Sequence, residues 1–126
     1  MDVDVTFESG GQPYPEGYDW RPISAYEASL VELLLSASIG ERPVVPDRVR
    51  ALDECRCVEF DAGQPEGPVT ILAEAFVPPD HACYPLEVML SVRGAKVCWL
   101  EFHRYGQNRG CRPPAEEFEI SARNVG

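Results

Sequence analysis

The sequence predicts an α+β domain in which one principal N-terminal α-helix packs on a mainly antiparallel β-sheet of four to six strands. Three observations support this fold class: a capped segment with an apolar face after residue 24, several strand-like segments between residues 49 and 105, and a length of 126 residues. That length suits one hydrophobic core and is short for two. We therefore expect a single domain over residues 1–126, with helix and sheet each burying one apolar side.

The first twenty residues predict a strand or ordered arm followed by a loop. Apolar and polar residues alternate over residues 3–7, as in a half-buried strand. Residues 10–20 are rich in glycine, proline and aromatic residues, and the prolines exclude a regular helix or a central strand. The rings of this loop can either pin it onto the core, which is their commoner role, or form a recognition surface; they are Tyr14, Tyr18 and Trp20.

A helix is predicted to begin at Ser24. In the segment 24–27, the Ser24 hydroxyl can accept the amide hydrogen of Glu27, while the Glu27 carboxylate can accept the amide hydrogen of Ser24, which is a capping box. The following apolar residues recur at helical spacing and should face the core. The helix should end near Gly40, because glycine favours helix C-termini. We expect Glu27 and Glu32 to face solvent.

Four further segments predict strands: residues 49–60, 69–77, 86–92 and 97–105. In the third, apolar residues alternate with Glu87, Met89, Ser91 and Arg93, so one face should be dry and the other largely wet. The joint 93–96 is short enough for a tight hairpin in which Gly94 adopts a positive φ, which makes the third and fourth segments antiparallel neighbours. A last strand is predicted at residues 118–122.

The net charge limits the classes of partner. A formal charge of -10 repels phosphate backbones and anionic membranes, so we expect neither nucleic-acid nor membrane binding. Residues 1–40 hold seven acidic residues against Arg21 alone, which predicts a negative surface that binds a basic protein, although acids that only keep a protein soluble are equally common. The predicted partner-binding residues are Tyr14, Glu16, Tyr18, Asp19, Trp20, Glu27 and Glu32.

The cysteine count indicates reduced thiols. Five cysteines at irregular positions are unlike the even framework of a secreted disulfide scaffold. The amino terminus carries acids where an export signal would carry basic residues, and no run of about 20 apolar residues could span a bilayer. We therefore expect a cytoplasmic protein with all five thiols reduced.

Metal binding and thiol catalysis are the two chemistries that the sequence permits. Cys55 and Cys57 share one face of a strand, and a metal site could be completed by His81, Cys83 and His103, but no Cys-x-x-Cys pair is present. Cys83 or Cys98 could act as a nucleophile with either histidine, but on a regular strand Cys98 and His103 face opposite sides. We expect no metal, no cofactor and no catalysis. A small cysteine- and histidine-dependent enzyme or metal-binding protein is the alternative, and a structural or assembly role is a third possibility.

Two pieces of the chain carry a family resemblance. Residues 94–106, Gly-Ala-Lys-Val-Cys-Trp-Leu-Glu-Phe-His-Arg-Tyr-Gly, resemble the late strand of small bacterial immunity proteins, and Arg21-Pro22-Ile23 before the leucine-rich helix resembles their opening. Cys98, Trp99 and His103 depart from that pattern, and the proline-rich residues 77–85 have no counterpart in it. The resemblance implies a protein that neutralises a cognate toxin by binding it, without a reaction of its own.

Overall fold

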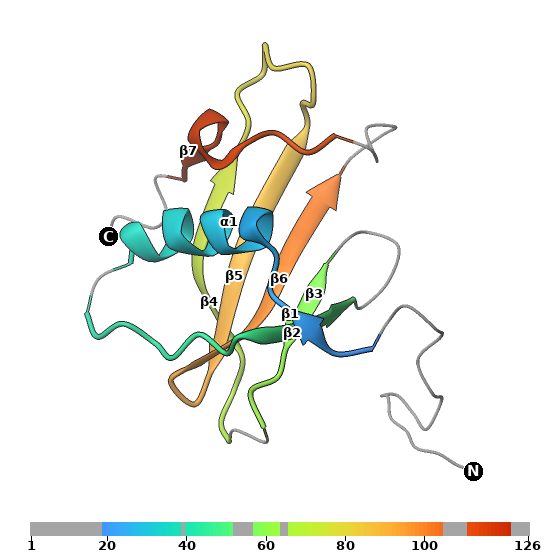
Figure 1. Cartoon of the computed structure of the whole chain (residues 1–126). Helices are drawn as coiled ribbons and strands as arrows, with labels where there is room; N and C mark the ends of the chain where they lie inside the picture. Colours follow the sequence, from blue (N-terminus) through green and yellow to red (C-terminus); the bar gives the residue numbers. More distant parts are fainter. Residues whose placement is uncertain (1–18, 39, 52–56, 64–65, 105–110, 122–126) are drawn as a thin grey trace.

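A computed structural model describes residues 19–38, 40–51, 57–63, 66–104 and 111–121 of the chain (Figure 1). These residues form one α-helix, one short 3-10 helix and seven strands in a single sheet of order β1-β2-β3-β6-β5-β4-β7. Every neighbouring pair of strands is antiparallel. The elements are β1 (Arg21–Pro22), α1 (Ala25–Ser36), β2 (Arg48–Ala51), β3 (Val58–Phe60), β4 (Thr70–Phe76), β5 (Leu86–Arg93), β6 (Lys96–Arg104), η1 (Ala115–Glu117) and β7 (Glu119–Ile120).

The predicted α+β class with an antiparallel sheet is confirmed, whereas the predicted count of four to six strands is wrong. The segment 49–60 forms two paired strands, β2 and β3, instead of one. The two-residue strand β1 was not predicted; it contains Pro22, which an edge strand tolerates because one side of such a strand has no partner. The predicted strand or arm at residues 3–7 lies outside the described residues.

The capping box at the start of α1 is confirmed. The Ser24 hydroxyl accepts the amide hydrogen of Glu27 at 3.1 Å, and Glu27 Oε1 accepts the amide hydrogen of Ser24 at 2.9 Å. The helix ends at Ser36, before the predicted limit of Gly40, because the amide of Ala37 donates to Leu34 in a tightened last turn. The buried face of α1 packs on β4 and β5 (Figure 1), and its buried apolar residues are Leu30, Val31, Leu34 and Leu35.

The hairpin between β5 and β6 is confirmed. Gly94 and Ala95 have φ values of 59° and 65°, and two successive positive values give the turn a twist that suits antiparallel strands. The connection that follows α1 joins this hairpin, because the Val44 amide donates to the Ala95 carbonyl and the Val97 amide donates to the Val44 carbonyl, each at 2.9 Å. This isolated parallel bridge was not predicted.

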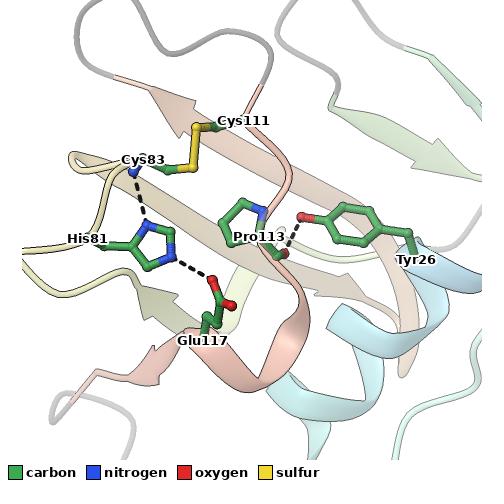
Figure 2. Close-up of a disulfide and its surroundings, with 6 residues drawn as sticks. All are labelled: Tyr26, His81, Cys83, Cys111, Pro113 and Glu117. Carbon is green, nitrogen blue, oxygen red and sulfur yellow. Dashed lines mark hydrogen bonds and ion pairs between the residues drawn. A yellow bond between two sulfur atoms is a disulfide. The ribbon is translucent and has the colours of Figure 1, made fainter.

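A disulfide joins Cys83 to Cys111, which makes the prediction of five reduced thiols wrong (Figure 2). Cys57 is likewise disulfide-bonded, and Cys98 is the free thiol among the described cysteines. The two bonded residues are 28 positions apart and come together because the β4–β5 loop lies beside the segment that leads into η1. An odd cysteine count requires one unpaired thiol and does not exclude pairs among the others. Within the described part of the chain, no helix has the length and apolar character needed to cross a membrane.

Candidate functional site

The sheet has two faces, and only one of them is covered by the helix. α1 lies across one face, and no described helix lies on the other, which we call the open face (Figure 1). Because residues directly opposite one another in an antiparallel pair share a face, the strand register assigns the side chains to three rows. The open face includes a first row of Arg50, Glu59, Trp99, Ser91 and Ile71, a second of Glu101, Met89 and Glu74, and a third of His103, Glu87, Phe76 and Glu119. Alternation along β5 and β2 adds Arg93, which stands opposite Lys96, and Arg48 to the same face.

The first row begins with a stacked ion pair. Arg50 Nε lies 3.0 Å from Glu59 Oε1, and the Arg50 guanidinium lies 4.3 Å from the centre of the Trp20 ring. Glu59 in turn stands opposite Trp99. The half-buried Trp20 ring is therefore held against β2 by a cation–π contact, as expected for an aromatic residue that pins a loop.

The open face is acidic and partly apolar. Its five carboxylates belong to Glu59, Glu74, Glu87, Glu101 and Glu119, and its basic residues are Arg48, Arg50, Arg93 and Lys96. Met89 stands directly between Glu74 and Glu101, and Phe76 stands between Glu87 and Glu119. Four of the five carboxylates lie in the second and third rows, so the negative potential that attracts cations is concentrated on that half of the face.

Each end of the open face is hollowed. At the β4–β5 end is a hollow of about 340 Å³ between the third row and the β4–β5 loop, lined by Phe76, Val77, Pro79, Tyr84, Pro85, Leu86 and Glu87. At the hairpin end is a smaller hollow of about 80 Å³, whose lining includes Glu59, Arg93, Cys98 and Trp99. Only the first falls within the usual volume of a ligand pocket.

Of the predicted partner-binding residues, the structure describes Asp19, Trp20, Glu27 and Glu32. Asp19 and Glu32 are exposed, and Glu32 forms an ion pair with Arg42 at 2.5 Å. Trp20 packs under Arg50 as described above. The prediction that Glu27 faces solvent is wrong, since its relative exposure is 4%. The other three predicted contacts lie outside the described residues: Tyr14, Glu16 and Tyr18.

Glu27 can be buried because it has an ion-pair partner. That partner, Arg21, lies outside α1, so the spacing of residues along the helix does not reveal it. Arg21 on β1 donates to both carboxylate oxygens of Glu27, with Nη1 to Oε1 at 2.9 Å and Nη2 to Oε2 at 2.6 Å. Burial raises the pKa of Glu27, but the hydrogen bonds from Arg21 and Ser24 outweigh it and hold that pKa below its ordinary value. Glu27 is therefore a structural anion, not part of a contact surface.

Figure 2 shows why His81 and Cys83 do not form a catalytic pair. The Cys83 sulfur is bonded to Cys111, so this cysteine carries no thiolate. The Cys83 amide donates to His81 Nδ1 at 2.9 Å, which places the ring hydrogen on Nε2, 2.6 Å from Glu117 Oε1. Both ring nitrogens of His81 are thus engaged, and neither is available as a general base.

Cys98 is a buried thiol at an irregularity of β6. Ser91 stands opposite Trp99 and Val92 opposite Val97, so Cys98 is an extra residue without a partner across the pair. The extra residue interrupts the alternation along β6, so the assumption of a regular strand, which assigned Cys98 and His103 to opposite faces, does not hold. Burial raises the pKa of the Cys98 thiol, and the nearby Arg93 opposes this only in part. A raised pKa makes the thiol a poor nucleophile.

Among the described residues, no three side chains of His, Cys, Asp or Glu are grouped so that they could hold a metal ion. No protein-family model, curated protein or solved structure matches this chain. The geometry of the open face is therefore the basis for assigning a function.

Apart from His103, which was considered as a metal ligand or a base, the open-face residues were not selected from the sequence, although a signal for them was present. Glu87 and Met89 alternate with buried residues on β5, and Glu101 and His103 do the same on β6. This alternation identifies one wet face for each strand. It does not show that β5 lies between β6 and β4, which is what brings the carboxylates of three strands together.

Proposed function

We propose that this chain is a non-catalytic, acidic protein-binding domain, of the kind found in immunity and antitoxin proteins, whose open face binds a basic partner protein. The observation that carries the proposal is the combination, on a sheet face that no described helix covers, of five carboxylates with apolar side chains. Protein interfaces are enriched in tryptophan, methionine and phenylalanine, and the open face supplies Trp99, Met89 and Phe76.

The two kinds of side chain have separate roles in this proposal. The carboxylates accelerate encounter with a positively charged protein and disfavour nucleic acid. Trp99, at the centre of the sheet, provides the contact area that holds the complex once formed. An enzymatic function based on Cys83 and His81 has no support in their geometry, since the sulfur is in a disulfide and both ring nitrogens are engaged.

The experiment is capture of the partner from a lysate of the source cells, followed by mapping with matched variants. Trp99→Ala and Glu101→Gln on the open face should each weaken binding of the captured partner. Glu32→Gln removes one carboxylate from the exposed side of α1 and serves as the control. Equal weakening by Glu32→Gln and Glu101→Gln would place the contact elsewhere and overturn the assignment to the open face.

We propose a cytoplasmic location, and the Cys83–Cys111 disulfide is an argument against it. Cytoplasmic glutathione and thioredoxin keep most protein thiols reduced. Trapping the thiols with an alkylating reagent in intact cells, before lysis, decides the question. Free thiols at both positions would support a cytoplasmic protein, whereas an intact bond would support an oxidising compartment.

A further inference from the structure

The smaller hollow, at the hairpin end of the open face, contains an arginine donor that lacks an acceptor. Arg93 lies at the end of β5 and lines this hollow together with Cys98 and Trp99. Its Nε is buried and has no hydrogen-bond partner in the described part of the chain. A buried N–H group without an acceptor is costly, so each one in a folded protein requires an explanation. The orphaned Nε points to an acceptor from outside the chain.

The surrounding groups do not supply a negative charge to Arg93. Glu59 also lines the hollow, but its carboxylate is paired with Arg50 at 3.0 Å, and no described carboxylate forms an ion pair with Arg93. The Cys98 thiol stays protonated at neutral pH, because burial raises its pKa. Lys96, directly opposite Arg93 on β6, adds a second positive charge. This end of the face therefore favours an anion, although the chain as a whole is acidic.

One wall of the hollow is fixed by hydrogen bonds. This wall is contributed by the segment 60–63, which lies at the same end of the sheet as the β5–β6 hairpin (Figure 1). Lys96 Nζ donates to the Ala62 carbonyl at 3.3 Å, which joins the wall to the hairpin. The Asp61 amide donates to the Arg48 carbonyl at 2.9 Å, which joins the wall to β2. A wall fixed in this way loses little conformational freedom when a ligand binds.

The geometry of the free donor and the size of the hollow favour a carboxylate. The Nε and the adjacent Nη of a guanidinium present two parallel N–H groups, which match the two oxygens of a carboxylate. A hollow of about 80 Å³ is too small for a whole ligand but holds one group of about three non-hydrogen atoms, since a water molecule takes about 30 Å³. Phosphate is larger and carries more negative charge, which Glu59 in the wall and the net charge of -10 both disfavour.

We propose that this hollow binds one carboxylate of the partner protein, from an aspartate or glutamate side chain, through Nε and one Nη of Arg93. The proposal rests on the proposed function for the existence of a protein partner, whereas the affinity of the hollow for a carboxylate is a property of this chain alone. Trp99 lines the same hollow, so the bound carboxylate lies beside the residue that holds the complex. An acidic group of the partner at this end and basic groups over the second and third rows together fix its orientation.

The test uses acetate as the probe and the side-chain Nε–H signal of Arg93 as the measurement, in NMR spectra of the 15N-labelled full chain. Acetamide is the neutral control of the same size, and chloride at the same ionic strength controls for general screening. We expect a saturable downfield shift of the Arg93 signal with acetate and none with either control. No shift with acetate, an equal shift with acetamide or chloride, or tighter binding of inorganic phosphate would overturn the assignment to a carboxylate.

Variants separate the arginine fork from its charge. Arg93→Lys keeps the positive charge but lacks the paired donors, so it should lose the acetate-dependent shifts of nearby backbone amides, as Arg93→Gln should. Arg48→Gln is the matched control, because Arg48 is an exposed arginine of the same face that donates to the Trp20 carbonyl. It should leave acetate binding unchanged. Full binding by Arg93→Lys, or equal loss in Arg48→Gln, would show that acetate responds to charge alone and that the proposal is wrong.

The captured partner distinguishes failure of this proposal from failure of the proposed function. Arg93→Gln should raise the dissociation constant of the complex by about tenfold or more, as expected for loss of a hydrogen bond to a charged group. A general attraction to a basic partner predicts the reverse, because this variant makes the chain more acidic. Weakening by Trp99→Ala and Glu101→Gln but not by Arg93→Gln would overturn the carboxylate site and leave the open face as the binding surface. Weakening by all three variants supports both proposals, and a partner insensitive to all three would overturn both.

Discussion

Arg21 and Glu27 form a two-point ion pair in which one partner is buried and the other is not. The Glu27 side chain is 6% exposed and that of Arg21 is 41% exposed, with 2.6 Å between Nη2 and Oε2. The same carboxylate accepts the amide hydrogen of Ser24. Glu27 therefore joins the edge strand β1 to the start of α1, and its loss would disturb both elements.

Replacing Glu27 by glutamine should lower the free energy of unfolding by about 1 to 3 kcal/mol, because a buried hydrogen-bonded anion is lost and the Arg21 guanidinium loses its partner. Urea denaturation of both proteins at neutral pH measures this difference. Glu32→Gln is the control, since Glu32 is exposed and its ion pair with Arg42 contributes little. Equal effects of the two substitutions would show that the buried pair has no special role.

The contribution of Glu27 should depend on pH in a defined direction. Its pKa in the folded protein is lower than the ordinary value of 4.5, so the stabilisation is present above about that pH and is lost as the pH falls through the folded-state pKa. The stability difference between the parent and Glu27→Gln should therefore shrink below pH 4.5. Denaturation curves recorded between neutral and acidic pH test this, and a difference that stays constant throughout would contradict the assignment.

The Ser24 hydroxyl should contribute to stability as a helix cap. Ser24→Ala removes the acceptor for the Glu27 amide and should cost about 0.5 to 2 kcal/mol. Ser29→Ala provides the control, because Ser29 is an exposed residue within α1 whose hydroxyl bonds only to the preceding turn. Thermal or denaturant melts in which Ser24→Ala overlays the parent would contradict the observed cap.

Features set by near neighbours in the chain were predictable from the sequence. The Ser24–Glu27 capping box needs only a three-residue spacing, and the hairpin at Gly94 needs only four residues. The ion pair of Glu27 was not predictable, because Arg21 reaches it only after β1 has paired with β2. The periodicity that places Glu27 on a helix gives no information about what packs beside it.

The candidate site shows the same division between local and long-range structure. Alternation along β5 predicted that Glu87 and Met89 share a wet face, but the strand order that aligns them with Glu74 and Glu101 depends on pairings across the whole sheet. The Cys83–Cys111 bond likewise cannot be deduced from cysteine spacing. The extra residue at Cys98 breaks the alternation on which the face assignment in β6 relied.

The Cys83–Cys111 disulfide should be a major contribution to stability. Cross-linking residues 28 positions apart reduces the entropy of the unfolded chain by an amount worth about 3 to 4 kcal/mol. The double variant Cys83→Ser, Cys111→Ser should therefore unfold at clearly lower urea concentration, whereas Cys98→Ala should have a smaller effect. A double variant as stable as the parent would show that the bond is absent in the protein.

The Cys98 thiol should be unreactive in the folded protein. It is 8% exposed, and its burial raises its pKa, so the reactive thiolate is scarce at neutral pH. Iodoacetamide should label Cys98 only after denaturation, as peptide mass spectrometry can show. Rapid labelling of Cys98 in the native protein at neutral pH would contradict both the burial and the raised pKa.

The central claim is that the carboxylates of the open face attract a basic partner protein. The most direct test is the association rate of the captured partner measured against ionic strength, because charges separated by more than about 8 Å are largely screened at physiological salt. We predict that the rate falls steeply as salt is added. At low salt, neutralising Glu87 and Glu101 together should slow association, while Glu32→Gln should leave the rate unchanged. A rate that is independent of salt, and unaffected by the loss of Glu87 and Glu101, would contradict the account.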